Sequence, residues 1–168
     1  METRRRVRAL PALFAVLGLG AADPDSARDG VRLAGRWFET PVRRAVRSAA
    51  ERLADPSCAR VLTTFHDGEG RPLAARLDAL ALDAPSYARR VLFYDGSSEN
   101  LCRGRIHAFT VPGSRVVRVC PELGWAALLD APLAEAVVIH EVLHTLGLQE
   151  NPPSSEQITA SVSRHCGR

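Results

Sequence analysis

The sequence predicts an α+β fold that is mostly helical, with a small mixed or antiparallel sheet. Its 168 residues, of which 46% are hydrophobic and 24% charged, suit one globular domain of ordinary size. Apolar residues recur at helical spacing along most of the chain, whereas β-favouring runs are confined to residues 91–119. This distribution favours helices packed beside a small sheet over a sandwich or a barrel.

The first 22 residues have the order that is typical of a secretory signal. Four arginines within residues 4–8 precede the apolar run 9–20, and the small residues Gly20 and Ala22 fit a cleavage site after Ala22. The apolar run is shorter than the roughly 20 residues of a membrane span. We therefore expect a signal peptide at 1–22, a single domain at 23–168, and a secreted or periplasmic protein without stable membrane insertion after signal removal.

The charge balance argues against a nucleic-acid partner. The chain has 22 basic and 19 acidic residues, a net charge of +3, but the basic excess lies in the predicted signal. The remaining chain is formally neutral, whereas binding a phosphate backbone needs clustered positive charge on the folded domain.

The first half of the domain is expected to be helical. A helical pattern extends over residues 27–54, and Pro41 is expected to split it into two helices. Helical spacing returns at 58–65 and 73–82, on either side of a turn at 67–70.

The sheet is expected in the middle of the chain. Residues 91–94 form a short β-favouring run, and runs at 106–111 and 115–119 flank the turn residues Pro112, Gly113 and Ser114. The sequence therefore predicts a small sheet with one hairpin.

Two helices are expected to close the chain. Residues 132–146 form the clearest helical pattern, with Pro132 suited to the first turn and Gly147 just beyond the end. The last helix is expected to start at Ser154, whose hydroxyl can cap it with Gln157 as the reciprocal partner.

All four cysteines lie in the predicted domain. An even number in an exported chain indicates two disulfides, for which three pairings exist. We favour Cys102 with Cys120, which would bracket the hairpin, and Cys58 with Cys166, which would tie the last helix to an early one. A four-thiolate metal site is disfavoured because no CxxC pair is present.

The helix at 132–146 contains an HExxH pattern. His140 and His144 lie one above the other at positions i and i+4, so both imidazoles can bind one Zn(II) ion. Glu141 follows the first ligand by about 100 degrees, which places its carboxylate beside the metal as a general base.

The longer string HExxHxxGxxE, which ends at Glu150, resembles the motif of the metzincin zinc peptidases. The resemblance implies a zincin-like fold, in which His140, His144 and Glu150 bind zinc and Glu141 is the catalytic base. The chain departs from that pattern in having glutamate at the third position and no methionine turn. In the related gluzincins the third ligand is a glutamate on a later helix, which leaves Glu156 as an alternative.

Further segments resemble a group of small exported bacterial zincin-like proteins. They are residues 144–159, 93–96 and 108–114. The resemblance covers about two thirds of the predicted domain and implies no particular substrate.

These observations predict an exported zinc-dependent metallopeptidase that hydrolyses peptide bonds in peptide or protein substrates. Glu141 would take a proton from a water molecule on the zinc, and an extended peptide would add to a strand edge within residues 109–119. Tyr94, His107 or an arginine could supply a donor for the oxyanion. Two alternatives remain open: a catalytically inactive zinc-binding envelope protein that binds a partner, and a disulfide-stabilised structural protein.

Overall fold

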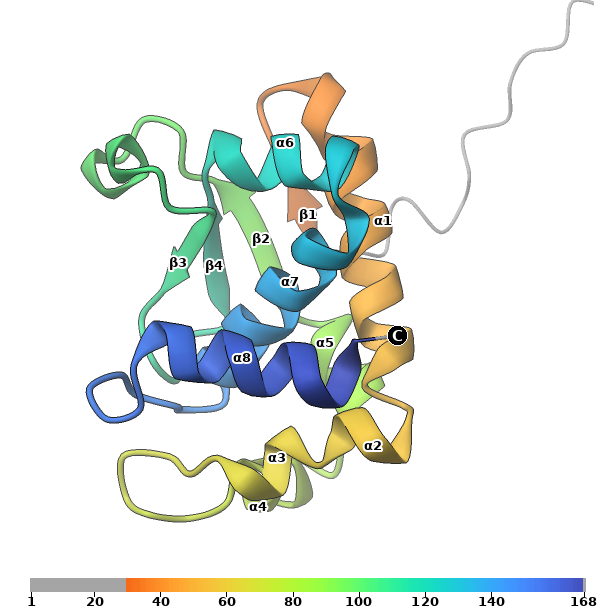
Figure 1. Ribbon diagram of the computed structural model, residues 1–168, viewed down its shortest axis with the longest axis vertical. Coiled ribbons are helices and arrows are strands. Elements are labelled where there is room, and N and C mark those ends of the chain that lie inside the picture. The colour runs from red at the N-terminus through yellow and green to blue at the C-terminus, as the bar shows by residue number, and fades with distance from the viewer. Residues whose placement is uncertain (1–29, 168) are drawn as a thin grey trace, which may run out of the picture.

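A computed structural model describes residues 30–167, and the predicted signal peptide at 1–22 lies outside them (Figure 1). It confirms the α+β class with a high helical content and one small sheet. Within residues 30–167, no helix is both long and apolar enough to cross a membrane.

The sheet is mixed and has the order β1-β2-β4-β3. β1 pairs in parallel with β2, β2 in parallel with β4, and β4 antiparallel with β3. The strands are β1 (Val31–Arg32), β2 (Leu92–Asp95), β3 (Ala108–Thr110) and β4 (Val116–Val119). The predicted hairpin is therefore confirmed as β3 and β4, and β3 lies at one edge of the sheet.

Helices cover one side of this sheet and extend below it in Figure 1. The longer ones are α1 (Arg36–Arg52), α6 (Pro121–Leu129), α7 (Ala131–Thr145) and α8 (Ser155–Cys166). The shorter ones are α2 (Pro56–Ala59), α3 (Val61–Thr64), α4 (Leu73–Ala79), α5 (Ala84–Ala88) and the 3-10 helix η2 (Asn100–Gly104).

α7 is the central helix, in contact with α1, α6, α8, β3 and β4. The carboxylate of Asp130 caps its start by accepting a hydrogen bond from the backbone N–H of Leu133 at 3.1 Å. Its second half, residues 138–145, is buried throughout, as expected for a helix enclosed by other elements. The helix predicted at 132–146 is thus confirmed.

α8 begins as predicted. The hydroxyl of Ser154 accepts from the backbone N–H of Gln157, whose side-chain oxygen accepts from the N–H of Ser154 at 2.9 Å. This reciprocal capping box starts the helix at Ser155, three residues before Ile158, the first of its buried positions.

Both favoured disulfides are present, Cys58–Cys166 and Cys102–Cys120. The first joins α8 to α2 across 108 positions of sequence, and the second brackets the hairpin across 18. Two disulfides indicate an oxidising, extracytoplasmic environment.

The predicted break at Pro41 is wrong. α1 runs unbroken from Arg36 to Arg52 with Pro41 inside it, and residues 31–32 form β1. Pro41 removes one backbone hydrogen bond, to the carbonyl of Trp37. Trp37 is 87% exposed, whereas the residues facing inward after Pro41 are buried, so packing outweighs the loss of that bond.

Three helices were not predicted: α5, α6 and the 3-10 helix η2. α6 has apolar residues on all sides and Gly124 in its middle, so it shows no helical periodicity. Pro121 at its first position was the available signal. For α5 the signal was Asp83, whose carboxylate accepts from the backbone N–H of Ser86 at 2.6 Å.

Replacing Gly124 with alanine is expected to destabilise the fold by roughly 1–3 kcal/mol. α6 approaches α1 so closely that a Cβ atom at Gly124 would overlap Cγ and Cδ1 of Phe38 and lie 2.9 Å from its Cβ. The Phe38 ring cannot simply move away, because it packs edge-on against Trp125 with ring centroids 5.1 Å apart. Urea unfolding of the variant checks this value. The cost should fall in a Phe38→Ala background, which removes Cγ and Cδ1 and leaves only the contact with Cβ at 2.9 Å. An equal cost in both backgrounds would contradict the steric cause.

Candidate metal site

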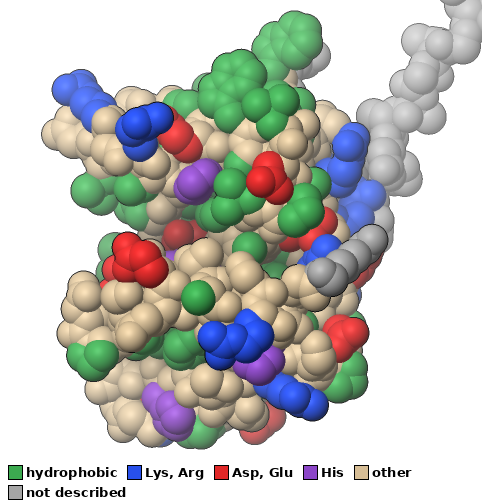
Figure 2. Space-filling model, viewed as in Figure 1, with side chains coloured by type: hydrophobic (Ala, Val, Ile, Leu, Met, Phe, Trp, Pro, Cys, Tyr) green, Lys and Arg blue, Asp and Glu red, His purple; other side chains and the backbone are tan. Residues whose placement is uncertain are grey.

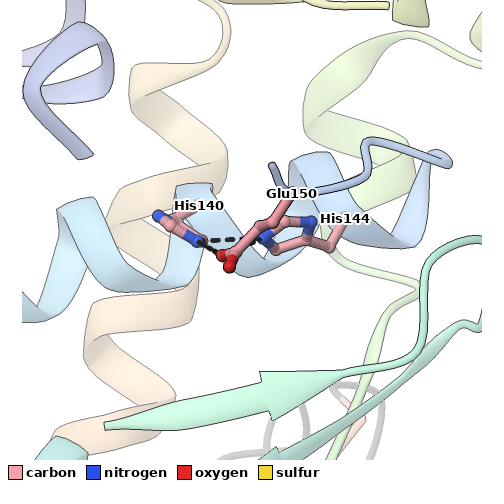
Figure 3. Close-up of side chains that lie close together, drawn as sticks. All are labelled: His140, His144 and Glu150. Carbon is pink, nitrogen blue, oxygen red and sulfur yellow. Dashed lines mark hydrogen bonds and ion pairs between the residues drawn. The ribbon is translucent and has the colours of Figure 1, made fainter. Parts of the chain in front are cut away.

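The second half of α7 and the turn that follows it bring the predicted residues together. α7 presents His140 and His144 one turn apart on the same face. Gly147 follows the helix at a φ of +109°, a conformation that favours glycine. The reversed chain then places Glu150 against both histidines. The three residues predicted as metal ligands therefore form one cluster (Figure 3).

The three ligand atoms point at one another. His140 Nε2 and His144 Nε2 are 2.9 Å apart, and Glu150 Oε1 lies 3.6 Å from the first and 3.3 Å from the second. Donor atoms around a tetrahedral zinc ion lie about 3.3 Å apart, because each is about 2.0–2.1 Å from the metal. The three distances in the cluster bracket this value, so these residues could hold a metal ion.

A hydrogen bond behind each imidazole fixes its orientation. His144 Nδ1 lies 2.7 Å from the backbone carbonyl oxygen of Leu148, and His140 Nδ1 lies 3.0 Å from the hydroxyl of Thr159. A carbonyl oxygen can only accept, so Nδ1 of His144 carries a hydrogen, which leaves Nε2 as the ring atom that can bind a metal. This is the arrangement in which metal-binding histidines are usually held.

His144 Nε2 faces the carboxylate oxygen Oε1 of Glu150, and both atoms are acceptors when a metal binds. Two acceptors 3.3 Å apart repel each other unless a cation or a proton lies between them. Burial, with His144 beside it, lowers the pKa of His140 to about 4, so this ring is neutral at pH 7. A metal cation would remove the repulsion and satisfy all three ligand atoms.

Glu141 lies beside the cluster and outside it. Its side chain is buried, and its Oε2 atom has no hydrogen-bond partner among residues 30–167. Burial, with Glu150 nearby, raises the pKa of Glu141 to about 8. A cation held by the histidines would favour the carboxylate form, which can act as a base.

The cluster and Glu141 lie in an open groove of about 700 Å³. One wall is the edge strand β3 with the segment that precedes it, and the other is the start of α8. The residues that line the groove are Leu101, Arg105–Thr110, Pro112, Val137, His140, Glu141, His144, Glu150, Ser155, Glu156 and Thr159. Figure 2 shows the hollow on this face, with acidic and histidine side chains at its rims.

The β3–β4 hairpin is hydrogen-bonded directly to α7. The backbone N–H of Gly113, in the turn between β3 and β4, donates to the carbonyl oxygen of His144 at 2.9 Å. Since His144 is one of the cluster residues, this bond fixes the edge strand relative to the site.

The other residues that the sequence suggested for the site, Glu156, His107 and Tyr94, differ in their position relative to the groove. Glu156 lines the groove, but it is exposed and its carboxylate accepts from the hydroxyl of Ser154 at 2.8 Å, outside the cluster. His107 lines the groove, so it stays a candidate oxyanion donor. Tyr94 does not line it: this residue lies on β2 and stacks under the guanidinium of Arg118.

Two contributors to the site were not predicted, the carbonyl of Leu148 and the hydroxyl of Thr159. Thr159 lies on α8, 19 positions after its partner His140, and nothing in the local sequence marks it. A backbone carbonyl has no sequence signature, although the turn at Gly147 indicates that the chain reverses there.

No family model, curated protein or solved structure matches this chain.

Proposed function

We propose that this protein is an exported zinc-dependent metallopeptidase. The observation that supports the proposal best is the convergence of His140 Nε2, His144 Nε2 and Glu150 Oε1 beside the buried carboxyl group of Glu141. Two imidazoles and a carboxylate are a ligand set that suits a catalytic zinc ion, which keeps a coordination position open. The arginine-rich start and apolar run of residues 1–22 support export.

The groove suits an extended peptide. β3 is at the edge of the sheet, and Ala108, Phe109 and Thr110 of this strand line the groove. A peptide backbone can pair with such an edge, which would bring its carbonyl groups past the cluster on α7. The substrate class is therefore peptides or unfolded segments of proteins.

Glu141 would move the protons in hydrolysis. It would take a proton from the attacking water as the water oxygen bonds to the scissile carbonyl carbon. It would then pass that proton to the amide nitrogen as the C–N bond breaks, giving a carboxylic acid and an amine. A bound zinc ion would make water more acidic and polarise the carbonyl group.

The proposal is tested by zinc content and peptide hydrolysis of the full chain. We expect one zinc ion per chain by elemental analysis, and cleavage of a mixed peptide library that stops on chelation and returns with zinc. Zinc binding without cleavage would identify the catalytically inactive alternative. A chain that binds no zinc would exclude both and leave the disulfide-stabilised structural protein.

The Glu150→Ala variant is expected to bind zinc much more weakly than the unsubstituted protein. The Glu156→Ala variant should bind zinc with the same affinity as the unsubstituted protein. Glu150 is the carboxylate in the cluster, while Glu156 is bonded to Ser154 at the start of its own helix. At zinc concentrations of about 100 times its dissociation constant, the ion should stabilise the fold by about 2.7 kcal/mol. Thermal unfolding with and without zinc measures this gain. A gain that survives Glu150→Ala and is lost in Glu156→Ala would reverse the assignment.

A further inference from the structure

The two imidazoles of the cluster are held in different ways. His144 is oriented by a backbone carbonyl, which no substitution can remove. His140 is oriented by a side chain from another helix, the hydroxyl of Thr159 on α8, at 3.0 Å from Nδ1. Helix α8, which follows all three candidate ligands in the sequence, therefore supplies a hydrogen-bond partner to the site.

The chemistry of metal binding sets a requirement at this contact. For His140 to bind a cation through Nε2, its Nδ1 must carry the ring hydrogen, and the buried N–H then needs an acceptor. The Thr159 hydroxyl can accept that hydrogen. The same hydroxyl can donate to Nδ1 when the site holds no cation and Nε2 carries the hydrogen, so it can serve both tautomers.

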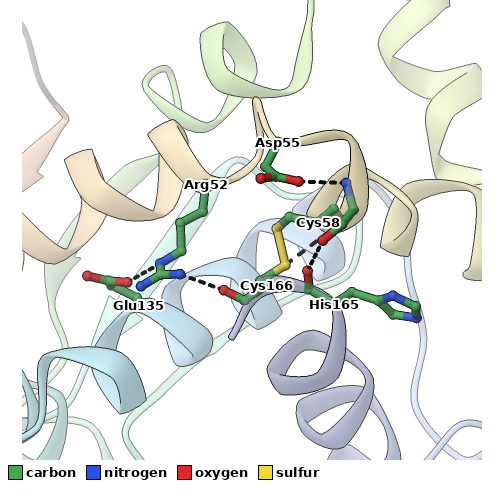
Figure 4. The surroundings of a disulfide bond; sticks show 7 residues. Arg52, Asp55, Cys58, Glu135, His165 and Cys166 are labelled. Carbon is green, nitrogen blue, oxygen red and sulfur yellow. Dashed lines mark hydrogen bonds and ion pairs between the residues drawn. A yellow bond between two sulfur atoms is a disulfide. The ribbon is translucent and has the colours of Figure 1, made fainter. Parts of the chain in front are cut away.

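α8 is fixed firmly enough to hold this contact. Its start has the capping box at Ser154, and its end is tied by the disulfide Cys58–Cys166 (Figure 4). Beside the disulfide, the Ser57 hydroxyl donates to the carbonyl of His165 at 2.7 Å and Arg52 donates to the carbonyl of Cys166 at 2.6 Å. Thr159 lies two helical turns, or roughly 10 Å, before this anchor.

We propose that Thr159 is the positioning residue for metal binding, because its hydroxyl orients the His140 ring and can accept the Nδ1 hydrogen that a cation-binding His140 carries. This inference rests on the proposed function, since it assumes that the cluster binds zinc. It adds a requirement that the ligand set alone does not contain: a hydroxyl on α8.

The test compares zinc affinities measured by competition with a chromophoric chelator. Thr159→Val keeps the shape of the side chain and removes the hydroxyl, and it should weaken zinc binding by roughly 10- to 100-fold. Thr159→Ser keeps the hydroxyl and should restore most of the affinity. Thr145→Val is the matched control: Thr145 is buried on α7, and its hydroxyl donates to the carbonyl of Val142 at 2.7 Å instead of to an imidazole. It should lower stability and leave zinc affinity unchanged.

The outcomes separate this inference from the proposed function. If the unchanged chain binds zinc and Thr159→Val binds it equally well, Thr159 has no positioning role and the metal site stands. Equal losses in Thr159→Val and Thr159→Ser, or a comparable loss in Thr145→Val, would point to packing and would also overturn the inference. If the unchanged chain binds no zinc, the proposed function fails and the inference with it.

Discussion

Glu141→Gln is expected to reduce peptide hydrolysis by roughly 10²- to 10⁴-fold while zinc stays bound. Glutamine has the same shape as glutamate but cannot take a proton at neutral pH. Glu141 contributes no atom to the ligand cluster, so the three residues that hold the metal are unchanged. The buried Oε2 of Glu141 has no hydrogen-bond partner among residues 30–167, so the substitution breaks no bond there that holds the fold.

The measurement is a rate of cleavage at saturating peptide, together with zinc content and thermal unfolding of the same sample. Glu51→Gln is a suitable control, because Glu51 is exposed on α1 and does not line the groove. We expect the control to cleave at the unchanged rate. A Glu141→Gln protein that holds zinc and cleaves normally would contradict the role of Glu141 as the base.

Removal of the disulfide Cys58–Cys166 is expected to lower the free energy of unfolding by about 4–5 kcal/mol. The bond closes a segment of 108 positions, and the entropy that a cross-link removes from the unfolded chain grows with the length of that segment. Removal of Cys102–Cys120, which spans 18 positions, should cost only about 3 kcal/mol. The two bonds therefore differ in their expected effect on the same fold.

Urea unfolding of two double variants, Cys58→Ala with Cys166→Ala and Cys102→Ala with Cys120→Ala, measures both costs. The proteins should be compared with a chelator present, so that metal binding does not add to the difference. A larger cost for the Cys102–Cys120 pair would show that local contacts, and not the length of the closed segment, determine the stabilisation.

The core of the site could be predicted from sequence because it depends on local spacing. His140 and His144 share a face of any helix that includes them. Glu150 comes three residues after Gly147, where the chain reverses direction. Only the three-dimensional structure distinguishes Glu150 from Glu156 as the third candidate ligand. Glu156 starts a new helix, whose capping interactions occupy its carboxylate.

The remaining features depend on contacts between distant segments. β1 has two residues and exists because Val31 pairs with Phe93, 62 positions later, so its local helical spacing was misleading. Thr159 reaches His140 only because α8 packs across α7. The disulfides were predictable because one brackets the predicted hairpin and the other joins the predicted last helix to an early one.

The two disulfides are nested, since Cys102–Cys120 lies wholly inside the segment closed by Cys58–Cys166. A chain whose cysteines were oxidised in the order of their synthesis would first join Cys58 to Cys102, which is not a native pair. Cys58 must therefore stay reduced until Cys166 has been made, or a wrong pair must be exchanged. Yield in a heterologous host should accordingly depend on a disulfide isomerase more than on the supply of oxidant.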